Sequence, residues 1–171
     1  MIKVTRDHML EVLNRYRSVT SLDEIPELST WDVSEITNFR SMFRRMENLK
    51  DISALSHWNV ANGINFDNMF EGCSSLEDLS PISRWNVANG INFQYMFCEC
   101  YSLEDLSPLS HWNVSKGYLF DGMFEGCCSL KGIKQLRNWH VPEEYDVKMM
   151  LSGNLISQDE IDNLNRSIKR H

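Results

Sequence analysis

The side chains best suited to chemistry in this sequence are its cysteines, and their spacing limits what they can do. Cys73, Cys100 and Cys127 recur every 27 residues, whereas Cys98 and Cys128 fall outside that register. A tetrahedral zinc site usually draws on Cys-x-x-Cys pairs, and this chain has only Cys-x-Cys and Cys-Cys. Neither extra cysteine has the nearby histidine and orienting acid that would activate a thiolate. We therefore predict no catalytic residue, no metal site and no cofactor. The three periodic cysteines are predicted to be small buried side chains, and an odd total and a reducing compartment argue against a disulfide.

A ladder of carboxylates is the second group with chemical potential. Asp51, Asp78 and Asp105 recur at the same period, with Glu77 and Glu104 beside them. Carboxylate oxygens could hold a divalent cation such as calcium. More often such side chains bond to local backbone N–H groups or face water, and Gly132 interrupts the ladder in the next copy. We prefer this second interpretation and keep calcium as the alternative.

These columns belong to a long internal repeat. Five tryptophans stand 27 residues apart, and residues 57–83 agree with residues 84–110 at 20 of 27 positions. A fixed period of this length indicates a stack of similar units. Stacked repeats build surfaces more often than catalytic pockets.

The apolar spacing within one copy predicts its local structure. Phe66, Met69, Phe70 and Cys73 lie at i, i+3, i+4 and i+7, which predicts a two-turn helix with Asn65 as its N-cap. Pro81 excludes a helix interior in the segment that follows. Residues 57–60 alternate polar and apolar, which predicts a short strand with the tryptophan and valine pointing inward.

Two helices are predicted outside the repeats. Residues 5–18 have an amphipathic pattern, and Ser157 with Glu160 forms a capping-box pattern before a stripe of Ile161, Leu164 and Ile168. A stack of repeats exposes its core at both ends, so a covering helix is expected at each. The predicted fold class is an α/β repeat solenoid of about five 27-residue units. Its parts are an N-terminal capping helix (1–21), a five-repeat solenoid (22–153) and a C-terminal capping helix (154–171), all in one domain.

The repeat also resembles a known family. Trp-Asp-Val-Ser-Glu-Ile-Thr-Asn-Phe-Arg-Ser-Met-Phe at 31–43, with Cys-Ser-Ser-Leu at 73–76, resembles the repeat of the BspA-like leucine-rich-repeat surface proteins. Residues 3–13 resemble the helical lead-in found before such repeats, and the resemblance covers roughly residues 3–151. It implies a leucine-rich-repeat-like solenoid without known catalytic activity, and attachment to or recognition of other proteins. Two departures are the Asn-Gly-Ile-Asn turn in copies two and three and the lack of a secretion signal or lipid anchor.

Charge and hydropathy narrow the partners and the location. Residues 51–130 hold two basic and ten acidic side chains, which disfavours a nucleic-acid backbone and suits a basic protein partner. A solvated acidic surface is the alternative. With no signal-peptide or membrane-spanning run, we predict a cytoplasmic protein without membrane insertion. Delivery to a host cell or surface stays open, and so does the oligomeric state, with a monomer as the working assumption.

Side chains that flank the tryptophans are the first candidate binding surface. If the tryptophans point inward, their neighbours point outward on one strand face and vary between copies: His57, Asn59, Arg84, Asn86, His111 and Asn113. The second candidate surface is the outer side of the predicted helices, with Tyr95 and Tyr101. Variation without function would explain both. The predicted structural core comprises Trp31, Trp58, Trp85, Trp112, Trp139, Phe70, Phe97, Phe124, Cys73, Cys100 and Cys127.

Taken together, these patterns favour a non-catalytic protein–protein interaction module that binds, scaffolds or inhibits a protein of unknown identity. The alternative is an adhesin-type surface protein that binds host matrix or carbohydrate. An enzyme would need a converging nucleophile, base and oxyanion donor. The sequence shows no cluster of histidine, cysteine and acid off the repeat register.

Overall fold

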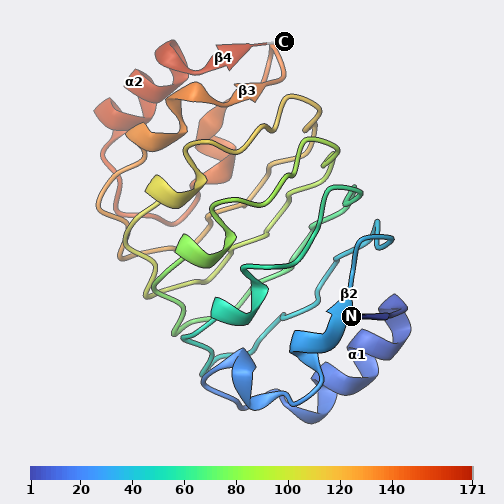
Figure 1. The fold of residues 1–171 in the computed structure, drawn as a ribbon. Coiled ribbons are helices and arrows are strands. Elements are labelled where there is room, and N and C mark those ends of the chain that lie inside the picture. The colour runs from blue at the N-terminus through green and yellow to red at the C-terminus, as the bar shows by residue number, and fades with distance from the viewer. Residues whose placement is uncertain (171) are drawn as a thin grey trace.

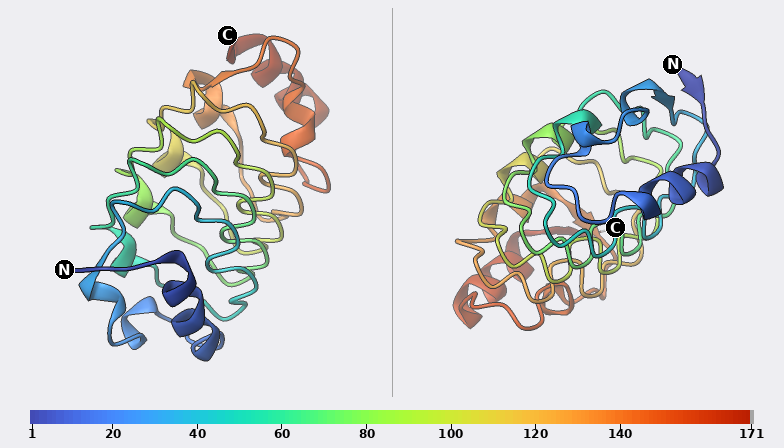
Figure 2. Two further views of the ribbon diagram at one scale, coloured as in Figure 1. Left: turned by 90° about the vertical axis from the view of Figure 1, so that its right-hand side faces the viewer. Right: turned by 90° about the horizontal axis from the view of Figure 1, so that it is seen from below.

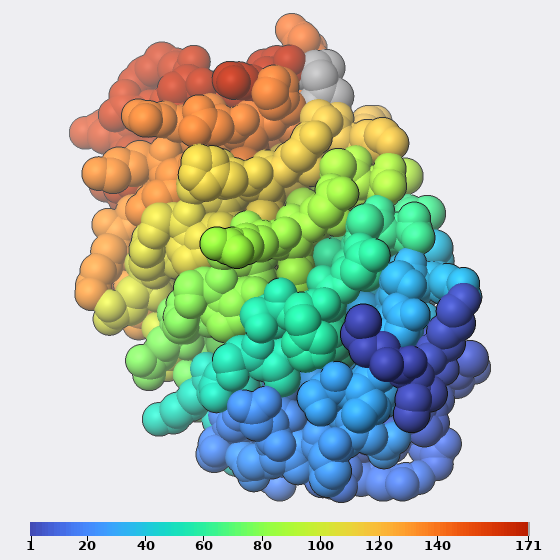
Figure 3. Space-filling view, in the orientation of Figure 1, coloured from blue at the N-terminus to red at the C-terminus, as the bar shows by residue number. Residues whose placement is uncertain are grey.

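The computed structural model describes residues 1–170, in which the chain forms coils that lie side by side between two helices (Figure 1). Successive coils follow nearly the same path (Figure 2), and each forms one band across the molecular surface (Figure 3). We number the coils by the 27-residue period: coil 1 (22–48), coil 2 (49–75), coil 3 (76–102), coil 4 (103–129) and coil 5 (130–156).

A helix and a short strand close each end of the stack. Helix α1 (Arg6–Arg15) begins after Thr5, whose side chain accepts a hydrogen bond from the His8 N–H. Helix α2 (Gln158–Ser167) begins after Ser157, whose side chain accepts from the Glu160 N–H. In a capping box the Glu160 carboxylate would accept a hydrogen bond from the Ser157 N–H. It accepts instead from the Ile133 N–H of coil 5, at 2.8 Å, and so holds α2 against the stack. Strand β1 (Ile2–Lys3) pairs in parallel with β2 (Trp31–Asp32), and β4 (Lys169–Arg170) with β3 (His140–Val141).

The short helix predicted over 66–73 is wrong, although its buried positions are right. Asn68 and Gly72 have φ values of 56° and 72°, outside the right-handed helical region. The N–H groups of Phe66, Asn68, Phe70 and Gly72 donate to carbonyls of coil 3 at 2.8–2.9 Å, not to the carbonyls four residues earlier in their own coil. Hydrogen bonds between coils therefore replace helical ones, while Phe66, Met69, Phe70 and Cys73 remain fully buried.

The strand predicted at residues 57–60 is also wrong as an element. Trp58 and Val60 do point inward, and His57 and Asn59 are exposed. Regular pairing at this place occurs only in the first and last coils, where a terminal strand supplies the partner. The inner coils are bridged elsewhere, by parallel contacts that join Asn38, Asn65, Asn92 and Leu119 in series.

A 3₁₀-helix precedes the tryptophan in each of the five coils. Leucine-type residues spaced by three suit its three residues per turn, and Pro81 lies in its first turn, where no N–H is required. The 3₁₀-helices are Leu22–Glu24, Leu28–Thr30, Ser53–Leu55, Ser80–Ile82, Ser107–Leu109, Lys134–Asn138 and Val147–Met150.

One continuous core runs the length of the stack and is built from equivalent residues of successive coils. Phe39, Phe66, Phe93 and Phe120 stack with centroids 5.4–5.5 Å apart. A second phenylalanine column has spacings of 5.3–5.8 Å. Burial of each ring contributes about 1.5–3 kcal/mol. The repeat signal in the sequence is therefore mostly a packing signal, and function has to be sought among the side chains that the core leaves outside.

Candidate protein-binding surfaces

The predicted strand face is exposed, and half of it has a structural role. His57, Arg84 and His111 are all exposed, one on each of three neighbouring coils. The three asparagines of the face are exposed as well, but each side-chain oxygen accepts the backbone N–H two residues later. Those bonds measure 3.2, 3.2 and 3.1 Å at Asn59, Asn86 and Asn113. The asparagines therefore close local turns, which leaves the histidines and Arg84 as the free part of this face.

The two predicted interface tyrosines differ in their surroundings. Tyr101 is exposed beside Glu99, whose charge raises the pKa of the phenol. Tyr95 is only partly exposed and has a φ of 53°. Its ring lies over Gly122, where an added Cβ would come within 2.3 Å of the Tyr95 Cε1. Tyr95 is thus part of the contact between coils 3 and 4 as well as part of the surface.

The eleven residues assigned to the core are 5% exposed or less. The structure adds polar contacts that the sequence did not indicate. The indole N–H groups of Trp85, Trp112 and Trp139 donate to carbonyls of the preceding coil at 2.9–3.1 Å. The thiols of Cys73, Cys100 and Cys127 likewise donate to the Phe43, Phe70 and Phe97 carbonyls at 3.1–3.3 Å. Burial raises the pKa of Cys73 and of Cys127 to about 12, so both stay protonated.

The carboxylates of the ladder accept hydrogen bonds from backbone N–H groups. One oxygen each of Asp51, Asp78 and Asp105 accepts the N–H of the serine two residues later, at 2.7–2.9 Å. The Ser53 N–H lowers the pKa of Asp51, and the Ser107 hydroxyl and N–H lower that of Asp105. Over residues 1–170, no group of three or more histidine, cysteine, aspartate or glutamate side chains is arranged to hold a metal ion.

A third surface, which the sequence interpretation missed, is a row of apolar side chains along one edge of the stack. Ile64, Ile91 and Tyr118 occupy one position of coils 2, 3 and 4 and are 43%, 44% and 67% exposed. We call these three residues the edge row. The backbone beneath them is fixed, because the N–H of each donates to the carbonyl of the equivalent residue in the preceding coil at 2.8–2.9 Å.

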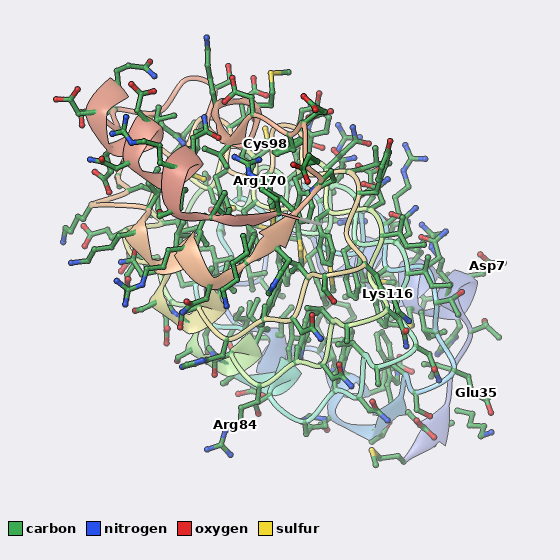
Figure 4. The ribbon with its side chains drawn as sticks, turned by 90° about the horizontal axis from the view of Figure 1, so that it is seen from above. Asp7, Glu35, Arg84, Cys98, Lys116 and Arg170 are labelled. Atoms are coloured by element: carbon green, nitrogen blue, oxygen red, sulfur yellow. The ribbon has the colours of Figure 1, made fainter. Side chains whose placement is uncertain are left out.

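A shallow pocket of about 490 Å³ follows the edge row and is lined by Glu35, Thr37, Asn62, Ile64, Asn89, Ile91 and Lys116. Its polar wall is also ordered from coil to coil. Asn62 donates to the Ser34 carbonyl at 2.7 Å, and Lys116 donates to the Asn89 side chain at 2.7 Å. Figure 4 shows Glu35 and Lys116 on a different side of the molecule from Arg84. The signal that could have revealed the row is an isoleucine outside every buried column, placed in a turn in two successive copies.

Pairs of arginines and carboxylates join coils 1 and 2. The Arg40 Nε lies 3.0 Å from the Asp67 Oδ2, and Arg44 contacts both Glu71 oxygens at 2.7 and 2.8 Å. Both carboxylates are almost buried. Burial raises the pKa of Asp67, and this effect is larger than the opposite effect of the Arg40 charge.

Two overlapping stretches of the chain, residues 9–127 and 80–165, match the family described as "Mycoplasma protein of unknown function, DUF285". The chain belongs to this family. The matched DUF285 stretches include all five tryptophans of the repeat, so the family is one of repeat proteins. No curated protein and no solved structure matches the chain. Within the described residues, no helix has the length and apolar character to cross a membrane.

Proposed function

We propose that this DUF285 protein is a non-catalytic protein-interaction module that docks a protein partner on the edge row. The observation that carries the proposal is the exposure of Ile64, Ile91 and Tyr118 on a backbone held by hydrogen bonds from coil to coil. Contiguous exposed apolar side chains with a polar rim are typical of protein interaction sites. A preordered backbone also lowers the entropic cost of binding.

The charge of the middle coils supports a particular kind of partner. Arg84 and Lys116 are the only basic side chains in residues 51–130, against ten acidic ones. Such a field steers basic proteins and repels acidic ones. The proposed partner therefore has an apolar contact patch with basic residues around it.

The classification of the fold is part of the same proposal. Parallel contacts between coils and 3₁₀-helices at a constant register support a leucine-rich-repeat-like solenoid of the BspA-like type. The five cysteines are free thiols. Free thiols that stack in a core suit a reducing compartment, which supports a cytoplasmic location for the protein and its partner.

The test compares two surfaces of one protein. The edge variant carries Ile64→Ser, Ile91→Ser and Tyr118→Ser, and the matched control carries His57→Ala, Arg84→Ala and His111→Ala on the strand face. Each protein is immobilised at equal density, and proteins captured from a lysate of the source cells are quantified by mass spectrometry. We expect the edge variant to capture at least about tenfold less of one protein that the parent captures in stoichiometric amount, a loss typical of removed interface anchors. Its melting temperature should equal that of the parent. Loss in the control variant alone would assign binding to the strand face and refute the edge row.

A further inference from the structure

The repeat supplies an internal comparison for its own ion pairs. In coil 2, Asp67 and Glu71 are each bound by an arginine four residues apart in coil 1, Arg40 and Arg44. The Arg44–Glu71 contact uses two guanidinium nitrogens and both carboxylate oxygens. This fork-to-fork geometry is the strongest and most directional form of such a pair. This position of the coil is therefore shaped to receive guanidinium groups.

In coil 4 the same two positions are again acidic, but their arginines are missing. Asp121 and Glu125 lie 54 residues after Asp67 and Glu71, which is two periods, and Gln94 and Cys98 stand where coil 1 has its arginines. Gln94 reaches Asp121 only at 3.4 Å. Among residues 1–170, no lysine, arginine or histidine nitrogen lies within 4.0 Å of either carboxylate.

These two carboxylates line an open pocket of about 500 Å³ between coils 4 and 5, together with Tyr95, Lys148 and Asn154. Lys148 is exposed and follows Asp121 by one period, but its ammonium is not among the ion pairs within 4.0 Å that residues 1–170 form. The cysteine column of coils 2–4 ends here in Asn154, whose side-chain nitrogen and oxygen are both buried and have no hydrogen-bond partner. An unpaired buried amide costs about 1–3 kcal/mol. Rotation of the Asn154 side chain towards the pocket that it lines would let a ligand supply the missing partner.

The polar and aromatic groups of this pocket suit one chemical class. Two half-buried carboxylates attract a cation, and the partly exposed Tyr95 ring provides a face for a planar one. Behind the pocket lining, the Tyr145 hydroxyl faces Asp121; burial, followed by the Asp121 charge, raises the pKa of Tyr145, so it stays a neutral donor beside that carboxylate. A guanidinium has five N–H donors in one plane, whereas an ammonium has three. The guanidinium can therefore donate to two carboxylates and an amide oxygen at the same time.

We propose that Asp121 and Glu125, with Tyr95 and Asn154, form a pocket for an arginine side chain of a protein partner. This proposal goes beyond the proposed function, because none of the residues that the structure describes lines both this pocket and the edge-row pocket. The two sites can therefore be disproved separately. At coil 2, Asp67 and Glu71 each have an arginine of their own, whereas at coil 4 the single guanidinium of the partner would lie between the two carboxylates.

The first experiment needs no variant. The probe is N-acetyl-L-arginine amide, and the matched probe is N-acetyl-L-citrulline amide, which has nearly the same shape without the charge. Both are titrated into the ¹⁵N-labelled full chain, with the amide signals of Gly122, Gly126 and Gly153 as reporters. We expect saturable shifts with the arginine probe, in the millimolar range usual for so small a ligand, and at least tenfold weaker binding of the citrulline probe. Equal binding of the two probes, or shifts confined to other coils, overturns the proposal.

The second experiment fills the pocket from within. Gln94→Arg with Cys98→Arg restores in coil 3 the arrangement of coil 1, so the new guanidinium groups should occupy Asp121 and Glu125. We expect this variant to lose arginine-probe binding at least tenfold and to melt at a higher temperature than the parent. Asp121→Asn with Glu125→Gln should lose probe binding as well, and should melt no lower than the parent, because it removes two half-buried charges that have no partner. Undiminished probe binding in the filled variant refutes the assignment.

Discussion

In each of coils 1–4 the backbone is left-handed at two positions, and the glycines among them lead to our most detailed prediction. Ser41, Asn68, Tyr95 and Gly122 share one column with φ values of 53–62°, and Arg45, Gly72, Glu99 and Gly126 share a second with φ values of 58–72°. An L-residue with a Cβ adopts this conformation at a cost of about 1–2 kcal/mol. Glycine occupies some of these positions and residues with a Cβ occupy the others, so one chain holds both glycine and non-glycine residues in the same left-handed conformation.

Two glycine substitutions separate backbone strain from steric overlap. At Gly126 an added Cβ would have its nearest neighbours at 3.7 Å, an ordinary contact, whereas at Gly122 it would lie 2.3 Å from the Tyr95 ring. Gly126→Ala therefore carries the conformational cost alone, offset by the reduced entropy of the unfolded chain, and should lose about 0.5–1 kcal/mol. Gly122→Ala adds overpacking of about 1–3 kcal/mol and should lose about 1.5–4 kcal/mol in total.

The assay is urea unfolding followed by tryptophan fluorescence, with melting temperature as a second measure. For a chain of this size each kcal/mol lowers the melting temperature by about 2–4 °C. In a Tyr95→Gly background the ring is absent, and the close neighbour that remains is the flexible end of Glu125, at 2.9 Å. Gly122→Ala should then cost about as much as Gly126→Ala. Equal losses for the two alanine variants in the parent protein, or an undiminished Gly122→Ala loss without the ring, would refute this reasoning.

Single side chains of the stack differ in their hydrogen bonds, their pKa and their exposure, and each difference can be measured. Trp112→Phe removes a hydrogen bond to the Ile82 carbonyl, whereas the indole N–H of the equally buried Trp58 has no partner among residues 1–170. Trp112→Phe should therefore lose about 1 kcal/mol more than Trp58→Phe in urea unfolding. Equal losses would show that the bond contributes nothing. The lowered pKa of Asp105 means that its stabilising effect is complete above its ordinary pKa of 3.8 and is lost as the pH falls through the lower folded value. Asp105→Asn should therefore melt below the parent at neutral pH, with a difference that shrinks towards about pH 2, and a constant difference would contradict the assignment. Iodoacetamide at neutral pH should alkylate the exposed Cys128 first. Cys98 should react slowly, because burial and then the Glu125 charge raise its pKa to about 12. If peptide mass spectrometry found Cys100 modified as quickly as Cys128, the buried cysteine column would be contradicted.

The sequence predicted burial better than it predicted secondary structure. Spacing of i, i+3, i+4 and i+7 identified the inward side chains of 66–73 correctly, because a turn series that bonds to the next coil presents the same positions inward as a helix would. The element itself could not be predicted from one copy. Its hydrogen-bond partners lie about 26 residues away in the neighbouring coil, and its left-handed residues include Asn68, which also suits a helix cap.

The candidate surfaces were predictable to different degrees. Alternation around each tryptophan was enough to place His57, Arg84 and His111 outside. It gave no sign that the asparagines of the same face close turns, since an asparagine in a turn and one in an interface look alike in sequence. The edge row was missed because Asn-Gly-Ile-Asn has turn composition, and the exposure of Ile64 depends on a backbone path that only the stacked coils define.

The repeat makes it possible to distinguish structural from functional positions within a single chain. Some polar side chains have a partner in the neighbouring coil: Cys73 donates to the Phe43 carbonyl, and Glu71 pairs with Arg44. Such positions are explained by the fold. Where an equivalent side chain has lost its neighbour, as Glu125 has with Cys98 in place of an arginine, the fold no longer explains the charge. Half-buried charges without a partner lower the stability of the protein. The acidic pair at coil 4 is therefore better explained by a cation that arrives from outside the chain than by packing within it.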